Sequence, residues 1–264
     1  MAAKKRNPFF TFSVVILLFI GSLLAWFFWR QIADSIQRFA YVEEDNTFTR
    51  YPGFGIWMPD NYSVHGIDVS RYQQRVNWSM VRKMKDGDIS IRFAFIKATE
   101  GSDLLDRQFA RNWKKARQHN VIRGAYHFFT DESSGHEQAM YFIKNVELLP
   151  GDLPPVLDIE RYTGNDPEDF VHNIDVWLKV IEEHYGVKPI IYSNAAFYNT
   201  YLEDAFEGYP LWVAHYQNKK QPSVQREWQF WQHNEQGRIN GINAFVDFNV
   251  FNGSEASFQK MLVP

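Results

Sequence analysis

The feature that most constrains the fold is an alternation of short apolar segments with segments of helical periodicity in the middle of this 264-residue chain. In one helical segment, apolar residues recur at three- and four-residue steps, at Ile174, Trp177, Leu178 and Ile181. This spacing is typical of one face of an amphipathic helix. The apolar segments are residues 64–68, 92–97, 121–128, 155–160 and 189–193. Strands that alternate with helices form mainly parallel sheets, so we predict an α/β protein.

From about residue 210 the rhythm changes. Three further apolar segments follow one another with too little chain between them for full helices, at residues 211–216, 227–232 and 245–250. Five strand–helix units and three bare strands make eight strands, the number that closes a barrel whose interior is filled by side chains. An open doubly wound sheet is the alternative. It is disfavoured because no glycine-rich phosphate loop follows any of the strands.

Composition excludes several classes of function. The chain has no cysteine, which excludes a disulfide framework, a thiolate nucleophile, a cysteine-ligated zinc site and an iron–sulfur cluster. Its 28 basic and 31 acidic residues give a formal net charge of -3, so there is no excess of positive charge to attract phosphates. We therefore expect no nucleic-acid partner.

The first 29 residues predict a membrane anchor. Residues 9–29 carry no charge, and at about 1.5 Å per residue they span the roughly 30 Å hydrocarbon core of a bilayer. Residues 1–8 include Lys4, Lys5 and Arg6, which favours a cytoplasmic N-terminus. A cleaved signal peptide is the alternative, but no small-x-small site closes the apolar run. We expect a single-pass protein of the cell membrane, with residues 64–264 outside the cytoplasm, in the periplasm or at the cell surface.

Residues 30–63 are predicted to connect the anchor to the globular part. Ile32, Ile36 and Phe39 recur at helical spacing, so the helix is expected to continue beyond the bilayer. Acidic residues and the Pro52-Gly53-x-Gly55 segment then break it. We interpret residues 43–63 as a stalk, and residues 64–264 as one catalytic domain.

Carboxylates occur where the predicted strands end, and this is the face on which parallel barrels build their active sites. Asp158 and Glu160 are two residues apart on a strand, so their side chains point to one face with Cα atoms about 6.6 Å apart. Like charges this close raise at least one pKa, leaving one acid protonated beside one that is ionised. Glycoside hydrolysis uses such a pair as proton donor and anion. The other acids of this kind are Asp68, Glu100 and Asp247. For Glu100 a cap of the next helix or an ion pair with a nearby base stays an open alternative.

Six motifs make the chain resemble a known family. In order, they are His65-Gly66-Ile67-Asp68-Val69-Ser70, Phe95-Ile96-Lys97-Ala98-Thr99-Glu100-Gly101, Gly124-Ala125-Tyr126-His127-Phe128, Leu157-Asp158-Ile159-Glu160, Ile191-Tyr192-Ser193-Asn194 and Val246-Asp247-Phe248-Asn249-Val250-Phe251. Their order is typical of family 25 glycoside hydrolases, the lysozyme-type N-acetylmuramidases, over residues 64 to about 252. The last motif has phenylalanine where leucine is usual, an apolar exchange that affects no catalytic group.

This resemblance implies an irregular TIM-like (β/α)5(β)3 barrel that cleaves the β-1,4 bond between N-acetylmuramic acid and N-acetylglucosamine in peptidoglycan. Glu160 matches the family's proton donor, Asp158 its partner acid, and Asp68 and Asp247 the acids of the first and last strands. Tyr126 and Tyr192 match aromatic positions that line the family's substrate groove. The partner acid either stabilises the sugar carbon C1 directly or orients the substrate's own acetamido oxygen, and a carboxyl separation of about 5 to 5.5 Å would favour the direct route.

Other residues near the same strand ends are candidates for contacts with the glycan. We include Glu100 and His127, and Trp212 and Tyr216 because their rings could stack on sugars. A metal site built from His65, Asp68 and His127 is conceivable, but the resembling family uses no metal, and we expect neither metal nor cofactor. Ser70 and Ser193 lack the setting of a serine nucleophile.

Two classes of function remain open for a protein whose partners are expected to be peptidoglycan strands and, through the N-terminal helix, the membrane. One is a membrane-anchored muramidase. The other is a catalytically weak peptidoglycan-binding or scaffold protein of the cell envelope. Retention of Asp68, Asp158, Glu160 and Asp247 favours the enzyme, because a binding protein has no need of a costly cluster of like charges.

Overall fold

The computed structural model describes residues 26, 29, 48–203, 205–217 and 220–264. The predicted cytoplasmic residues 1–8, the predicted membrane helix 9–29 apart from two tryptophans, and residues 30–47 lie outside the described residues. In the part that is described, no helix combines the length and apolarity needed to cross a membrane. The described fold belongs to one compact unit, which begins at Asp45 and ends at Pro264.

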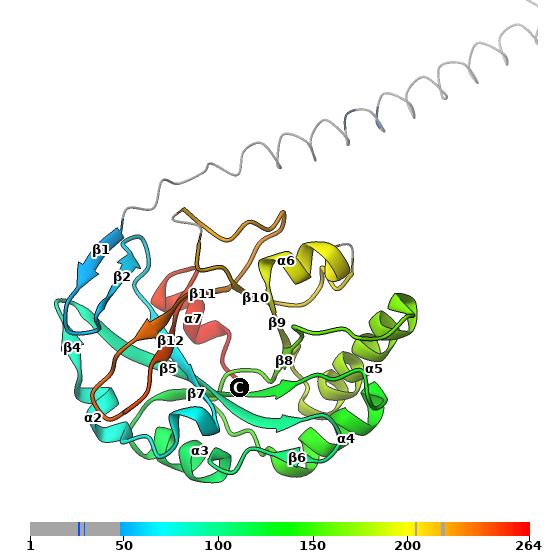
Figure 1. Ribbon diagram of the computed structural model, residues 1–264, viewed down its shortest axis with the longest axis horizontal. Coiled ribbons are helices and arrows are strands. Elements are labelled where there is room, and N and C mark those ends of the chain that lie inside the picture. The colour runs from blue at the N-terminus through cyan, green and yellow to red at the C-terminus, as the bar shows by residue number, and fades with distance from the viewer. Residues whose placement is uncertain (1–25, 27–28, 30–47, 204, 218–219) are drawn as a thin grey trace, which may run out of the picture. The chain divides into compact units, whose positions relative to one another are not determined.

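Within the described residues, eight strands close into a barrel, as the sequence predicts. The barrel closes because β3 pairs with β5 on one side and with β12 on the other. Figure 1 shows the strands in the middle of this unit with α2, α3, α4 and α5 outside them. In spatial order the strands are β3 (His65–Val69), β5 (Ile89–Glu100), β7 (Ile122–Phe128), β8 (Val156–Asp158), β9 (Ile190–Asn194), β10 (Leu211–Ala214), β11 (Phe230–Gly237) and β12 (Val246–Phe251).

The last strand runs in the opposite direction to the others. The seven barrel strands β3, β5, β7, β8, β9, β10 and β11 pair in parallel with their neighbours in this series, whereas β12 is antiparallel to both β11 and β3. The start of β12 therefore lies at the barrel end where the other strands finish. In this register Asp247, the second residue of β12, is opposite Asp68 near the end of β3.

Helices follow the first five barrel strands, which confirms the predicted order of five strand–helix units and three bare strands. They are α2 (Trp78–Lys83), α3 (Phe109–Gln118), α4 (Gly135–Asn145), α5 (Pro167–Tyr185) and the short α6 (Ala195–Phe197), which continues into η2 (Tyr198–Leu202). Helix α5 begins with Asp166 capping two backbone N–H groups and Pro167 in the first turn, and it ends at Gly186 in the left-handed conformation. A final helix, α7 (Glu255–Lys260), follows β12, and the remaining short elements are η1 (Arg71–Gln73), β4 (Lys85–Asp86) and β6 (Leu104–Leu105).

Alternation along the strands separates two apolar layers. On β5, Phe93 and Phe95 point into the barrel, and Ala94 and Ile96 pack against the helices outside. The rings of Phe93 and Phe95 pass over Gly66 and Gly124, where a Cβ atom would collide with them. The interior layer also contains Trp212, Phe230 and Phe258, and all of these side chains are buried.

A β-hairpin precedes the barrel, where the sequence analysis places a stalk. Strands β1 (Phe48–Tyr51) and β2 (Ile56–Pro59) pair antiparallel, and the Pro52–Gly55 segment forms their turn. Phe54 is completely buried against Phe248 of β12, at 5.3 Å between ring centroids, and its carbonyl accepts a hydrogen bond from the backbone N–H of Arg238. The predicted boundary at residue 64 is therefore wrong: the hairpin is too short to give a periodic signal, but it covers apolar surface of the barrel wall.

Three of the described histidines are buried with neutral rings. His65, His127 and His233 are between 0 and 4% exposed. Burial lowers the pKa of His65 and His127 to about 4 and that of His233 to about 3. An unfolded chain binds protons at these positions near pH 6.5, well before the folded protein does.

We expect acid to weaken the fold through these histidines. Because the folded-state pKa values are lowered, their contribution to stability is complete above pH 6.5 and is lost as the pH falls towards 4. His127→Gln should lose about 2 kcal/mol less free energy of unfolding than the wild type between pH 6.5 and 5. Denaturant titrations at both pH values test this, with the exposed His136→Gln as control. An identical pH dependence in the wild type and in His127→Gln would contradict the expectation.

Candidate active site

Four carboxylates from three strands meet at the carboxyl end of the barrel. Asp68 lies near the end of β3, Asp247 faces it from the start of β12, and Asp158 ends β8 with Glu160 two residues later. The charge of Glu160 raises the pKa values of Asp68, Asp158 and Asp247, so the four groups form one electrostatic cluster. The sequence analysis predicts this meeting from acids at strand ends. Asp247, however, lies at the start of its strand, and it reaches the site because β12 is antiparallel to its neighbours.

Asp68 is buried, but side-chain amides donate hydrogen bonds to its carboxylate. It is 7% exposed, and its Oδ2 accepts hydrogen bonds from Gln232 Nε2 at 2.7 Å and from Asn249 Nδ2 at 2.8 Å. Burial raises the pKa of Asp68 to about 6, and the hydrogen bonds to these two amides limit the rise. Asp68 is therefore predominantly ionised at neutral pH.

Asp247 is held in the opposite protonation state. Burial, followed by the negative charge of Asp68, raises the pKa of Asp247 to about 9. The two side chains are hydrogen bonded to each other. At neutral pH the neutral Asp247 thus donates to the ionised Asp68, and the two acids share one proton.

Asp158 and Glu160 differ in burial. Asp158 is 6% exposed, and its Oδ1 has no hydrogen-bond partner among the described residues. Burial, then the charge of Glu160, raises the pKa of Asp158 well above its usual value. Burial also raises the pKa of the half-buried Glu160, and the hydroxyl of Tyr192, which lies 3.3 Å from Glu160 Oε1, opposes the rise. Asp158 is therefore the deeper carboxyl of the pair, and burial favours the protonated form of both acids.

A chain of hydrogen bonds connects Glu160 to Asp68. Tyr192 Oη and Tyr216 Oη both donate to Gln232 Oε1, at 2.8 and 2.6 Å, and the amide nitrogen of Gln232 donates to Asp68. The predicted contact residues Tyr192 and Tyr216 are therefore at the site, and Tyr216 is 42% exposed at its rim. Tyr126 also lies there, because the charges of Asp68, Asp158 and Asp247 all act on it.

The sequence analysis does not identify Gln232 or Asn249 as site residues. For Asn249 a signal exists, because it lies two residues after Asp247 on one strand and so points to the same face. For Gln232 the sequence gives no such signal. Strand β11 pairs regularly up to Gln232, so Gln232 shares the inward face of Phe230, but an inward glutamine at a strand end does not by itself indicate a site.

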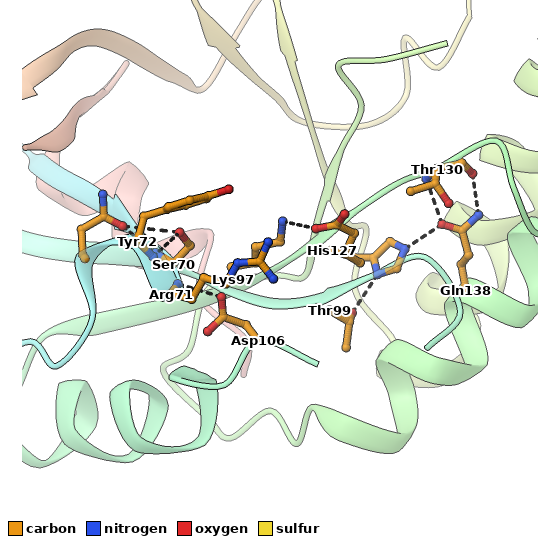
Figure 2. Close-up of polar contacts among 11 residues, drawn as sticks. Ser70, Arg71, Tyr72, Lys97, Thr99, Asp106, His127, Thr130 and Gln138 are labelled. Carbon is orange, nitrogen blue, oxygen red and sulfur yellow. Dashed lines mark hydrogen bonds and ion pairs between the residues drawn. The ribbon is translucent and has the colours of Figure 1, made fainter. Parts of the chain in front are cut away.

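His127 and Trp212 do not reach the site surface. His127 is fully buried on the outer side of β7, between Thr99 Oγ1 at 2.7 Å and Gln138 Oε1 at 3.0 Å (Figure 2). Trp212 is 2% exposed inside the barrel, where it stacks on Phe95 and donates from Nε1 to Asn249 Oδ1 at 2.8 Å. Neither side chain has surface to offer a sugar ring, so the prediction that they contact the glycan is wrong. His127 faces outward because its neighbour on the strand, Tyr126, faces inward.

Glu100 forms an ion pair that the sequence analysis leaves open as its alternative role. Its Oε2 accepts a hydrogen bond from Lys97 Nζ at 2.7 Å (Figure 2). The register of β5 against β7 shifts between Lys97 and Thr99, so the alternation is interrupted at Ala98. This interruption places Thr99 beside the outward His127 and leaves Glu100 beside Lys97. As for metals, no cluster of three or more candidate ligands is found in the described ranges.

Comparison with known proteins identifies related chains. Residues 67–242 match the family description "Glycosyl hydrolases family 25". Uncharacterized protein YegX of Escherichia coli strain K12 is 44% identical over 87% of this chain and 82% of that protein. Lysozyme M1 of Streptomyces globisporus is 36% identical and covers 75% of this chain and 70% of its own length. The solved structure of a family 25 glycosyl hydrolase from Bacillus anthracis has a TM-score of 0.71 and 36% identity over 77% of this chain and 95% of that one.

We predict that Asn249→Ala raises the pKa of Asp68 above about 6 and destabilises the fold by about 1–3 kcal/mol. The substitution removes one donor to Asp68 and leaves the buried Trp212 Nε1 without its acceptor. A carboxyl-labelled NMR titration measures the first effect, and denaturant unfolding at pH 7 measures the second. Asn243→Ala, at an exposed position in the preceding loop, serves as control. Equal titration of Asp68 in the wild type and in Asn249→Ala would contradict the role given to Asn249.

Proposed function

The chain belongs to glycosyl hydrolase family 25 and is a glycoside hydrolase, and from this premise we propose that it cleaves the β-1,4 bond between N-acetylmuramic acid and N-acetylglucosamine in peptidoglycan. Support for this substrate comes from relatives whose names are Lysozyme M1 and N,O-diacetylmuramidase. The observation that carries the proposal is the cluster of Asp68, Asp158, Glu160 and Asp247 at the carboxyl end of the barrel.

The cluster supplies the asymmetry that acid catalysis requires. Burial keeps a proton on the Asp158–Glu160 pair at a pH where an isolated carboxyl would be ionised. Two acids coupled in this way titrate as a unit, so the shared proton is available from either group. We assign its delivery to Glu160, because Glu160 is the more exposed member and Tyr192 orients its carboxyl.

In the proposed reaction, Glu160 protonates the glycosidic oxygen as the bond from that oxygen to C1 breaks. Positive charge then develops at C1, and the anion left on Asp158 stabilises it directly or orients the acetamido oxygen of the substrate as nucleophile. Water adds to C1 in the second half of the reaction and returns a proton to Glu160. The unpartnered Oδ1 of Asp158 is free to make either interaction.

Tyr126, Tyr192 and Tyr216 are proposed as contacts for the glycan. Tyr216 offers an exposed ring at the rim, and the hydroxyls of Tyr192 and Tyr216 converge on Gln232. Asp68 and Asp247 are proposed to set the electrostatics of the site through the proton that they share. Trp212 supports Tyr192 and Asn249 from the interior of the barrel without touching the sugar.

We further propose that residues 9–29 anchor the protein in the cell membrane and that the barrel lies outside the cytoplasm, where peptidoglycan is found. The uncharged run of residues 9–29 and the basic residues before it support this placement.

Glu160→Gln should lose at least roughly 10²-fold of the rate on purified peptidoglycan, because general acid catalysis contributes about that much. Binding to insoluble peptidoglycan should be nearly unchanged, since the exchange preserves shape. Rates measured across the full pH range, with the exposed Glu183→Gln as control, test this. Equal rates for Glu160→Gln and wild type would rule out the assignment. Binding without any wild-type cleavage would favour the peptidoglycan-binding scaffold.

Removal of residues 1–30 should move the protein from the membrane fraction to the soluble fraction of cells. The reason is that no apolar segment of spanning length would remain in the sequence. Fractionation after alkaline washing, with the full-length chain in parallel, measures the change. A truncated protein that still resists alkaline extraction would contradict the anchor.

A further inference from the structure

Lys97 lies at the mouth of the barrel and is held on two sides. It continues the inward face of β5 beyond Phe93 and Phe95 and is in register with Tyr126 of β7. Its Nζ is 2.7 Å from Glu100 Oε2 and 4.6 Å from the ring centroid of Phe128, and its side chain is only 11% exposed. A cation–π contact and a hydrogen-bonded ion pair together restrict a side chain that is otherwise flexible.

We propose that Lys97 is the counter-ion of the Asp158–Glu160 pair and that Glu100 is the residue that holds it in place. Under this assignment Lys97 and Glu100, which both belong to the Phe95–Gly101 motif, are positioning residues. Glu100 then does not contact the glycan. The effect of Lys97 on catalysis rests on the proposed function, whereas its effect on the ionisation of Asp158 and Glu160 does not.

The positive charge of Lys97 acts on both acids of the pair. It opposes the rise that burial causes in the pKa of Asp158, and it does the same for Glu160. Arg161 also acts on Glu160, but its side chain is exposed, so water and salt screen it more than they screen Lys97. Lys97 therefore supplies the attraction that keeps one member of the pair ionisable in a buried site.

Other charged and titratable groups face the same pair from the surrounding strands and loops. On the sides of β3 and β12 these are Asp68, whose charge raises the pKa values of Asp158 and Asp247, and Asp247, whose hydrogen bond lowers the pKa of Asp68. Among the described residues, those that act on these acids and on one another are Asp68 of β3, Lys97 and Glu100 of β5, Tyr126 of β7, Arg161 after β8, Tyr192 of β9, Tyr216 after β10, Glu235 of β11 and Asp247 of β12. With Asp247 neutral, the negative members that act on the pair are Asp68 and Glu100, and the positive ones are Lys97 and Arg161. Because Arg161 is exposed and screened, losing Lys97 would leave the two acids of the pair with little to favour their ionised forms.

Catalysis by a pair of acids needs one protonated and one ionised group at the same pH. Without Lys97 both acids would keep their protons to higher pH, and the ionised partner of the proton donor would be scarce at neutral pH. Lys97 thus acts through Asp158 and Glu160, as a positioning residue and without contact with the reacting atoms.

Carboxyl-labelled NMR titration of the full-length protein tests the counter-ion directly. The signals of the pair are assigned with Asp158→Asn and Glu160→Gln. Lys97→Met should raise the titration midpoints of the pair by about one pH unit or more, since a nearby opposite charge shifts a carboxyl by 1–3 units. Lys97→Arg, which keeps the charge, should restore the midpoints to within a few tenths of a unit. Lys179→Met, which removes an exposed lysine from α5, should change nothing.

Glu100→Gln tests whether Glu100 holds Lys97 in place, a role that we call the clamp, or acts only through its own negative charge. The two roles predict opposite changes in the titration midpoint of Asp158. If Glu100 holds Lys97 at the pair, its loss releases the cation and the midpoints of Asp158 and Glu160 rise. If Glu100 is only another negative charge, its loss lowers the midpoint of Asp158, which would overturn the clamp. Thermal unfolding confirms that each variant is folded, and Lys97→Gln replaces Lys97→Met if the latter is not.

The pH–rate profile on peptidoglycan extends the test to catalysis. Lys97→Met should shift both limbs of the profile to higher pH and lower kcat near neutrality, with little change in KM. Unmoved midpoints in a folded Lys97→Met protein would overturn the proposal. Shifted midpoints in a protein that fails to cut peptidoglycan would uphold the counter-ion and refute the proposed function, so the two failures are distinguishable.

Discussion

Pairing between β12 and β3 closes the barrel, and the antiparallel direction of β12 brings Asp247 opposite Asp68. If β12 ran parallel to β3, its second residue would lie at the other end of the barrel. The same register places Asn249 where its amide reaches Asp68, and Trp212 supports Asn249 from the interior. The meeting of Asp68 and Asp247 therefore depends on the direction and register with which the last strand joins the sheet, and Phe251 of that strand packs into the aromatic interior of the barrel.

Burying four carboxylates together costs stability, and the protein offsets the cost differently for each one. Asp68 accepts two amide hydrogen bonds and stays predominantly ionised near neutral pH, whereas Asp247 keeps its proton and donates a hydrogen bond to Asp68. The Asp158–Glu160 pair has fewer donors, and Lys97 provides the compensating charge. Four acids of similar intrinsic strength thereby acquire different proton affinities, which is what acid catalysis by carboxyl groups needs.

Much of the fold follows from the spacing of apolar residues, and the remainder depends on contacts that spacing does not encode. The strand–helix rhythm predicts the closed barrel, and the strand-end acids predict where Asp158 and Glu160 lie. The sequence does not reveal which of two neighbouring residues faces inward, so His127 is predicted at the site although Tyr126 takes that position. An interruption at Ala98 turns Thr99 outward and Glu100 towards Lys97, and the four-residue strands of the hairpin are too short to show a period. Gln232 was missed because its role depends on contacts with Asp68, Tyr192 and Tyr216, which lie far from it in the sequence. The membrane helix at residues 9–29 stays a prediction, as it lies outside the described residues.

Mass analysis of the fragments released from purified peptidoglycan tests the central claim most directly, because the sugar at the new reducing end identifies the bond that was cut. The account predicts disaccharide-containing fragments that end in N-acetylmuramic acid, with no requirement for added metal. Fragments that end in N-acetylglucosamine would contradict it, since they would place the cleavage at the other glycosidic bond. Intact glycan strands after prolonged incubation with folded wild-type protein would also contradict it, and would leave the barrel as a binding protein.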